Sequence, residues 1–191
     1  MVGNIPNFTK MDVLRCFLQF SKKTGRQEIA KELELGEGTI RTILEVLKSK
    51  SLLDSTKKGH FLSKKGHDAL SQVNEFLSMP KNLFLQGIYP NFKKIGVVVR
   101  NVPSLKEIYK LRDIAVKNGA EGALILKFEN RLYAPESDYG QDYKELEKGF
   151  NFRNGDVLIV AFSNQKRYAE NGALAIAVDL NIPLKKFISG L

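Results

Sequence analysis

One segment near the start of the chain, residues 38–49, limits the possible folds most strongly. Its large apolar residues recur at i, i+3, i+4 and i+7, which places them on one side of a helix: Ile40, Ile43, Leu44 and Leu47. The other side has only small or polar residues: Gly38, Arg41, Thr42, Glu45 and Ser49. A helix patterned in this way buries its apolar side. We therefore expect a surface helix whose polar side faces solvent.

The residues before this segment predict two shorter helices. The first spans 10–20, and Thr9 offers the oxygen that caps its start. The second spans 26–33 and is followed by a tight turn over 34–36, in which Gly36 is the glycine expected just past a helix end. Two helices joined by a short glycine-containing turn, the later one presenting a polar face, form a helix-turn-helix.

Residues 51–63 predict two short strands around Lys57, Lys58 and Gly59, since Gly59 permits the positive φ that hairpin turns need. A lysine-tipped hairpin after a helix-turn-helix is a wing, and its lysines are suited to phosphate contacts. A further helix is predicted over 65–78. The chain has 30 Lys and Arg against 21 Asp and Glu, a formal charge of +9, which favours polyanionic partners.

Residues 35–44 and 58–66 resemble the corresponding segments of winged helix-turn-helix transcription regulators. More narrowly, the chain is similar to archaeal two-domain proteins with such a head and a second domain of unassigned function. The resemblance implies that Gly38, Thr39, Arg41 and Thr42 face duplex DNA and that Lys57 and Lys58 contact its backbone. It also suggests a homodimer, because regulators of this class commonly read palindromic sites.

Two further residues belong to the expected DNA-binding set. Glu45 has two possible roles. Its carboxylate could accept a hydrogen bond from a cytosine amine, or it could hold Arg41 in an i,i+4 ion pair and repel phosphate. His60, on the wing, is suited to a local hydrogen bond or a phosphate contact. Seven basic and two acidic residues within 39–67 favour DNA over the alternative, a head that binds protein or RNA.

A second, α+β or α/β layer domain is expected over 93–191, after a first domain over 1–80 and an ordered connector over 81–92. Its apolar runs predict strands at 95–100, 122–128 and 156–162, the first of them covered on both faces. Helices are expected over 104–117 and 165–180. The mixed stretch 131–149 suggests an extra strand and a short helix.

The best ligand candidate in this domain is the junction between its last strand and last helix. Ser163, Asn164, Lys166 and Arg167 lie there, where α/β sheets often bind ligands, and would suit a small anionic metabolite. Asn101 and Ser104 follow the first strand and are expected to face the same crevice. The alternative is that Ser163 or Asn164 only caps the helix and that the two cations are solvated.

Catalytic and metal-binding patterns are not apparent. The sequence contains neither the Gly-x-x-x-x-Gly-Lys-Ser/Thr phosphate loop nor the Gly-x-Gly-x-x-Gly motif. It has a single cysteine, Cys16, and no histidine after His67. We therefore expect no catalytic residue, metal or cofactor. It also has no run of eighteen apolar residues and no secretory signal, which predicts a cytoplasmic protein without a membrane partner. The small residues of 165–180 suggest either close packing on the domain's own sheet or a subunit contact.

The prediction is therefore a cytoplasmic, non-enzymatic transcription regulator that binds double-stranded DNA as a homodimer and senses a small anionic ligand. The alternative is an enzyme or binding protein for such a ligand with an accessory winged helix.

Overall fold

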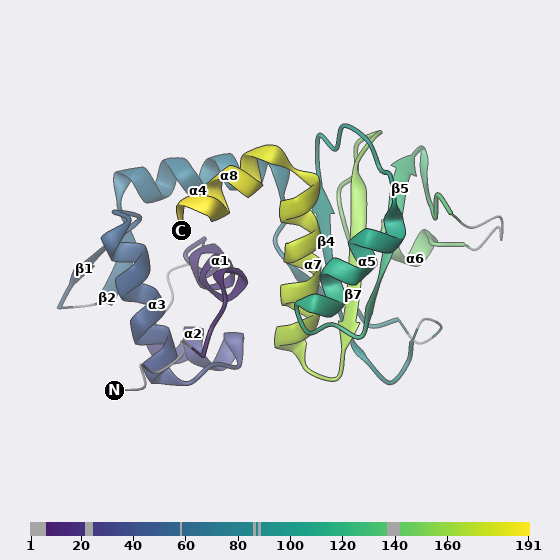
Figure 1. Cartoon of the computed structure of the whole chain (residues 1–191). Coiled ribbons are helices and arrows are strands. Elements are labelled where there is room, and N and C mark those ends of the chain that lie inside the picture. The colour runs from purple at the N-terminus through teal and green to yellow at the C-terminus, as the bar shows by residue number, and fades with distance from the viewer. Residues whose placement is uncertain (1–6, 22–24, 58, 86, 88, 137–141) are drawn as a thin grey trace. The chain divides into compact units, whose positions relative to one another are not determined.

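The computed structural model describes the chain except for residues 1–6, 22–24, 58, 86, 88 and 137–141, and it divides into two compact units (Figure 1). The first unit comprises Met1–Val73 together with Phe187–Leu191, and the second comprises Asn74–Lys186. The domain limits expected at residues 80 and 93 differ from this division. Residues 81–92 belong to the second unit, and the last five residues belong to the first.

The first unit has the winged helix-turn-helix arrangement that the sequence predicts. Its elements are α1 (Lys10–Gln19), α2 (Arg26–Leu33), α3 (Glu37–Ser49), the hairpin strands β1 (Leu53–Thr56) and β2 (Gly59–Leu62), and α4 (Lys64–Phe76). Thr9 caps α1 as expected. Gly59 has φ 125°, the left-handed conformation that the hairpin turn was expected to require.

The turn between α2 and α3 differs from the sequence prediction in one respect. The residue in the left-handed region just past α2 is Glu34, with φ 54°, and not the glycine. Gly36 instead has an extended backbone and is the N-cap of α3. The carbonyl of Gly36 accepts the first hydrogen bond of that helix, from the Ile40 N–H at 3.0 Å.

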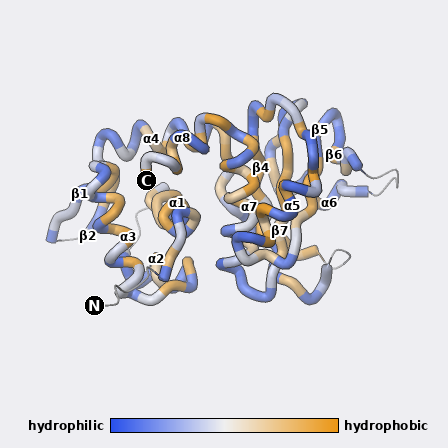
Figure 2. The backbone as a smooth tube through the Cα atoms, in the orientation of Figure 1, coloured by the Kyte–Doolittle hydropathy of each residue, from blue (hydrophilic) through white to orange (hydrophobic). Residues whose placement is uncertain are grey.

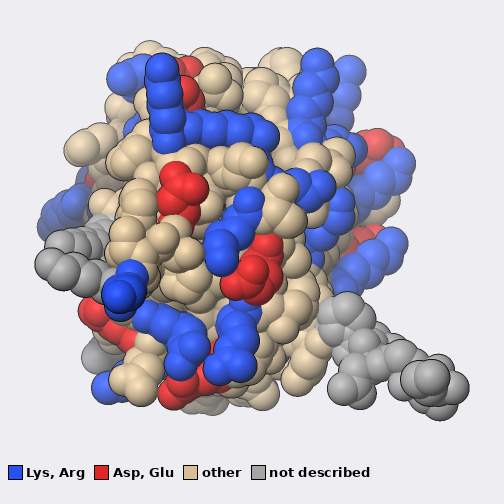
Figure 3. Space-filling view, turned by 90° about the vertical axis from the view of Figure 1, so that its left-hand side faces the viewer, with Lys and Arg blue, Asp and Glu red and all other residues tan. Residues whose placement is uncertain are grey.

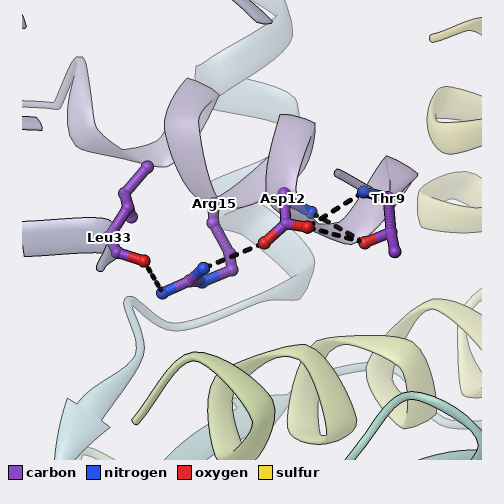
Figure 4. Close-up of polar contacts among 4 residues, drawn as sticks. All are labelled: Thr9, Asp12, Arg15 and Leu33. Atoms are coloured by element: carbon purple, nitrogen blue, oxygen red, sulfur yellow. Dashed lines mark hydrogen bonds and ion pairs between the residues drawn. The ribbon is translucent and has the colours of Figure 1, made fainter. Parts of the chain in front are cut away.

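The core of the first unit combines apolar stripes with one buried ion pair. The four apolar residues of α3 are at most 1% exposed, as the helical pattern predicts. Figure 2 shows orange, hydrophobic stretches along the backbone of α3. Asp12 and Arg15, both fully buried on α1, form an ion pair at 3.0 Å (Figure 4). Arg15 also donates to the Leu33 carbonyl at 3.2 Å, which ties α1 to the end of α2.

A helix that the sequence analysis missed, α8 (Ile182–Gly190), begins in the second unit and ends in the first. The Phe187 ring packs on Phe17 of α1 with centroids 5.4 Å apart. Lys10 donates to the carbonyls of Ile188 at 3.2 Å and Ser189 at 3.3 Å. A cation at the carbonyl end of a helix is electrostatically favourable. Residues 187–191 are therefore part of the structure of the first unit.

The second unit is built on a five-stranded sheet in which every neighbouring pair is antiparallel. The strand order is β3-β4-β7-β5-β6. The strands are β3 (Lys81–Asn82), β4 (Lys93–Val99), β5 (Gly122–Glu129), β6 (Arg131–Tyr133) and β7 (Val157–Ser163). The extra strand expected within 131–149 is β6, and the short helix is α6 (Lys144–Glu147). Antiparallel pairing makes this unit α+β.

Two helices pack beside this sheet, α5 (Ile108–Lys117) and α7 (Lys166–Leu180) (Figure 1). The small residues of α7 allow close packing within the chain, since a Cβ on Gly172 would lie 2.7 Å from that of Ala120 and 3.4 Å from that of Ala115. Residues 169–178 are all buried, so close internal packing accounts for the small side chains. Neither α7, the longest described helix, nor any other described helix has the length and apolarity to span a membrane.

Candidate functional site

The polar side of α3 is open to solvent. Gly38, Arg41, Thr42 and Glu45 are exposed and Thr39 is half-buried, while the apolar stripe on the other side of the helix is buried. The sequence pattern therefore places these five candidate residues on one accessible helix surface, which we call the α3 face.

Hydrogen bonding on the α3 face contradicts one of the two roles considered for Glu45, the ion pair with Arg41. The Glu45 carboxylate pairs with Lys48, with N and O 3.4 Å apart, and not with Arg41. Among the described residues, the Arg41 side chain forms no hydrogen bond or ion pair. The Thr42 hydroxyl donates to the Gly38 carbonyl at 3.2 Å. The Arg41 guanidinium therefore keeps its donors available for a partner outside the first unit.

The start of α3 leaves backbone N–H groups accessible. Its N-cap, Gly36, provides no side-chain hydrogen bond, so the first N–H groups of the helix have no capping side chain. A Cβ built on Gly36 or Gly38 would meet no heavy atom of the described residues within 4 Å. Arg26 of α2 lies beside this end through an ion pair with Glu37 at 3.3 Å. The combination suits an approaching phosphate.

The hairpin adds a second surface beside α3. Lys57 is exposed at its turn, and Lys58 lies outside the described residues. His60 is half-buried, and its pKa is lowered from the ordinary 6.5 first by burial and then by the positive charge of Lys48. The His60 Nδ1 atom is buried and has no hydrogen-bond partner among the described residues.

Figure 3 views the side of the molecule that carries α3 and the hairpin. Lys and Arg side chains are spread over this surface with fewer acidic side chains among them. Two of the nearby acids are already paired with cations, Glu37 with Arg26 and Glu45 with Lys48. Pairing reduces the repulsion that these carboxylates would exert on a polyanion.

The ligand candidates in the second unit do not form one crevice. Because β4 and β7 are antiparallel, Val99 at the end of β4 pairs with Val157 at the start of β7, and Ser163 pairs with Lys93. Asn101 and Ser104 therefore lie at one end of the sheet and residues 163–167 at the other, about 20 Å away at the usual rise per strand residue. The prediction of a shared crevice was wrong because it assumed the strand directions of a parallel sheet.

The junction itself divides into residues with different roles. Ser163 is 2% exposed and donates to the Gly119 carbonyl at 3.5 Å, so it faces the interior. Asn164 is exposed, and the N-cap of α7 is Gln165 rather than either residue expected to cap it. The Arg167 guanidinium lies over the Tyr168 ring, 5.8 Å from its centroid. Lys166 lines a hollow with Lys93 and Lys94, which the sequence analysis did not single out.

Within the described part of the chain, His, Cys, Asp and Glu side chains form no group of three or more that could hold a metal ion. The single cysteine, Cys16, is buried in α1, and burial raises the pKa of its thiol to about 12. A thiol with so high a pKa is not a nucleophile at neutral pH.

Comparison with known proteins assigns the chain to a family. Residues 10–68 match the family described as "PH0730-like, N-terminal domain", and residues 90–180 match the "Domain of unknown function (DUF4443)". The hypothetical protein PH0730 from Pyrococcus horikoshii OT3 has a solved structure that is 30% identical in sequence to this chain. The match covers 94% of this chain and 99% of that one, with a TM-score of 0.76.

The chain belongs to the PH0730-like family. The two matched segments of this family fall in different units, one in the winged-helix first unit and one in the sheet-containing second unit. The search of curated proteins gave no match. The family assignment thus covers both units of the chain.

Proposed function

We propose that this protein is a sequence-specific DNA-binding transcription regulator, with α3 as its recognition helix. The observation that carries the proposal is the α3 face: an exposed helix surface on which Arg41 has no partner among the described residues. An exposed arginine without a partner can donate two hydrogen bonds to a guanine in the major groove.

The neighbouring groups support the same assignment. The start of α3, which has no capping side chain, and the exposed Lys57 of the hairpin are both suited to phosphate contacts. In winged helices such contacts position the protein on DNA. In this mechanism α3 enters the major groove, Arg41 and Thr42 contact base edges, and the hairpin follows the adjacent backbone. The second unit serves dimerisation, ligand sensing or both, with a homodimer on a two-fold-symmetric site as the expected assembly.

Binding to duplex DNA across a salt series, measured by fluorescence anisotropy, tests this proposal. Lys57→Ala is expected to weaken binding to all sequences alike and to reduce the slope of log K against log salt by about one unit.

Arg41→Ala is expected to lower the binding free energy for a selected DNA site by about 1–3 kcal/mol and to relax the preference at one base pair.

Lys117→Ala is the matched control for these measurements. This lysine is exposed on α5 in the second unit, so its removal changes the net charge equally without altering the α3 face. Equal losses in the Lys57 and Lys117 variants would show that only net charge matters. Unchanged affinity in Arg41→Ala would remove the α3 face from the interface, and tighter binding to an RNA duplex than to DNA would favour the RNA-binding alternative.

A further inference from the structure

We propose that the second unit binds an organic anion with an apolar body in a hollow between the start of β4 and the start of α7. The hollow has a volume of about 540 Å³. This lies within the range of typical small-molecule sites. One part of its lining is apolar: Leu83, Phe84, Leu85, Pro90 and Phe92. The other part includes three lysines: Lys93, Lys94 and Lys166.

Lys94 is the residue that points to an anion. It is 5% exposed, although it carries an ammonium group. Its Nζ donates to the Phe92 carbonyl at 2.9 Å, and no described carboxylate pairs with it. Burying a cation without a negative partner is costly. An anion in the hollow would supply the missing charge and further hydrogen-bond acceptors.

The sheet register places the start of β4 and the start of α7 at the same end of the sheet. Lys93 pairs with Ser163 and Lys94 with Phe162, so the start of β4 lies against the end of β7. The chain reaches Lys166, the first residue of α7, three residues after β7 ends. Lys93 and Lys166 each take part in another interaction of the chain, so Lys94 is the cation of the hollow that is left for a ligand. The fold therefore places a buried ammonium group beside the hollow.

The apolar lining defines the rest of the ligand. Phe84 is 95% exposed at the hollow, an unusual position for a phenylalanine. Phe162 is the residue paired with Lys94 across the sheet, and the Tyr89 and Phe92 rings contact its ring with centroids 4.0 Å and 5.6 Å away. Apolar groups beside a buried ammonium match a carboxylate, phosphate or sulfonate joined to an aliphatic or aromatic group, rather than a free inorganic ion.

This inference rests on the sensing role proposed for the second unit, for which it names a class of ligand. The binding of that ligand does not depend on DNA binding. Binding can be measured on the whole protein without DNA. A protein that binds DNA but not the anion would contradict this inference alone, and the reverse result would contradict only the proposal about α3.

The test uses 8-anilinonaphthalene-1-sulfonate, a fluorescent aromatic anion, and N-phenyl-1-naphthylamine, which has the same ring system without the sulfonate. Lys94→Met keeps the length of the side chain and removes its charge. We expect this change to weaken binding of the sulfonate about tenfold, because a charge-assisted hydrogen bond is lost. Binding of the neutral compound should not change, and Lys117→Met should bind both compounds as the parent protein does.

Equal affinity of the parent protein and Lys94→Met for the sulfonate would overturn the proposal, as would the absence of binding. Displacement of the sulfonate by inorganic phosphate as readily as by decanoate would overturn the requirement for an apolar body. Circular dichroism establishes that each variant is folded. Should Lys94→Met not fold, Lys94→Gln provides the same comparison, because it removes the charge and keeps a donor for the Phe92 carbonyl.

Discussion

Replacing Gly66 by alanine is expected to lower the free energy of unfolding of the first unit by at least about 3 kcal/mol, at the upper end of overpacking effects. Gly66 lies in the first turn of α4, where a Cβ would stand 2.0 Å from the carbonyl oxygen of Leu52. That oxygen also accepts a hydrogen bond from the Ser63 N–H at 3.1 Å. Relief of the clash would require movement of backbone that joins the hairpin to α3 and α4.

Gly38→Ala is the matched control for this experiment. Gly38 is also a helical glycine, but a Cβ on it would meet no described heavy atom within 4 Å. Alanine there should leave stability unchanged or raise it by about 0.5–1 kcal/mol, since glycine is a weaker helix former. Urea unfolding of both variants, followed by circular dichroism, measures the difference. A Gly66→Ala protein as stable as its Gly38→Ala counterpart would show that α4 does not approach Leu52 so closely.

Loss of the Asp12 carboxylate is the second change with a large expected effect. Asp12→Ala should lower the free energy of unfolding by about 3–5 kcal/mol, because it removes a carboxylate paired with the fully buried Arg15 guanidinium. It also removes the acceptor of the Thr9 N–H at 2.9 Å and of the Thr9 hydroxyl at 3.1 Å. Chemical denaturation is again the measurement.

Two further variants separate the ion pair from the helix cap. Thr9→Ala should lower the free energy of unfolding by only about 1 kcal/mol, the usual effect of losing an N-cap side chain. The double change Asp12→Asn/Arg15→Met should cost less stability than the sum of the two single changes, because both charges of the buried pair are then removed together. Simple additivity of the single changes would show that Asp12 and Arg15 do not stabilise one another.

The first unit could be predicted from its sequence because its signals are local. The α3 stripe, the Thr9 cap and the Gly59 turn each depend on residues within a few positions of one another. The α3 face was found for the same reason, since helical periodicity alone determines which residues share a side. The pairing of Glu45 with Lys48 instead of Arg41 was not predictable, because both partners lie within reach on the helix.

The second unit was harder because its sheet depends on pairing between distant segments. A run such as Val157–Ser163 is buried along its whole length and reads alike in a parallel or an antiparallel sheet. Strand direction decides where Asn101 lies, and it also brings Lys94 close to Lys166. Before the pairing is known, Lys94 is one of many lysines, so no local signal marks the hollow.

The missed helix α8 did have a local signal. Asn181 accepts from the Leu184 N–H at 3.0 Å, as an N-cap does, and Pro183 lies in the first turn, where proline is tolerated. Leu184 and Ile188, spaced i,i+4, are both buried. Asparagine followed by proline and this spacing could have predicted a helix over 182–190.

The packing of Phe187–Leu191 against α1 affects the order in which the chain acquires its structure during synthesis. Lys10 and Ile188 are 178 positions apart, yet they are joined by a hydrogen bond within one unit. Domains near the start of a chain commonly fold first as they leave the ribosome. Because Phe187 follows the second unit in the sequence, Phe17 of α1 gains its aromatic neighbour only after nearly all of that unit has been translated. The winged helix is thus begun before the second unit is translated and completed after it.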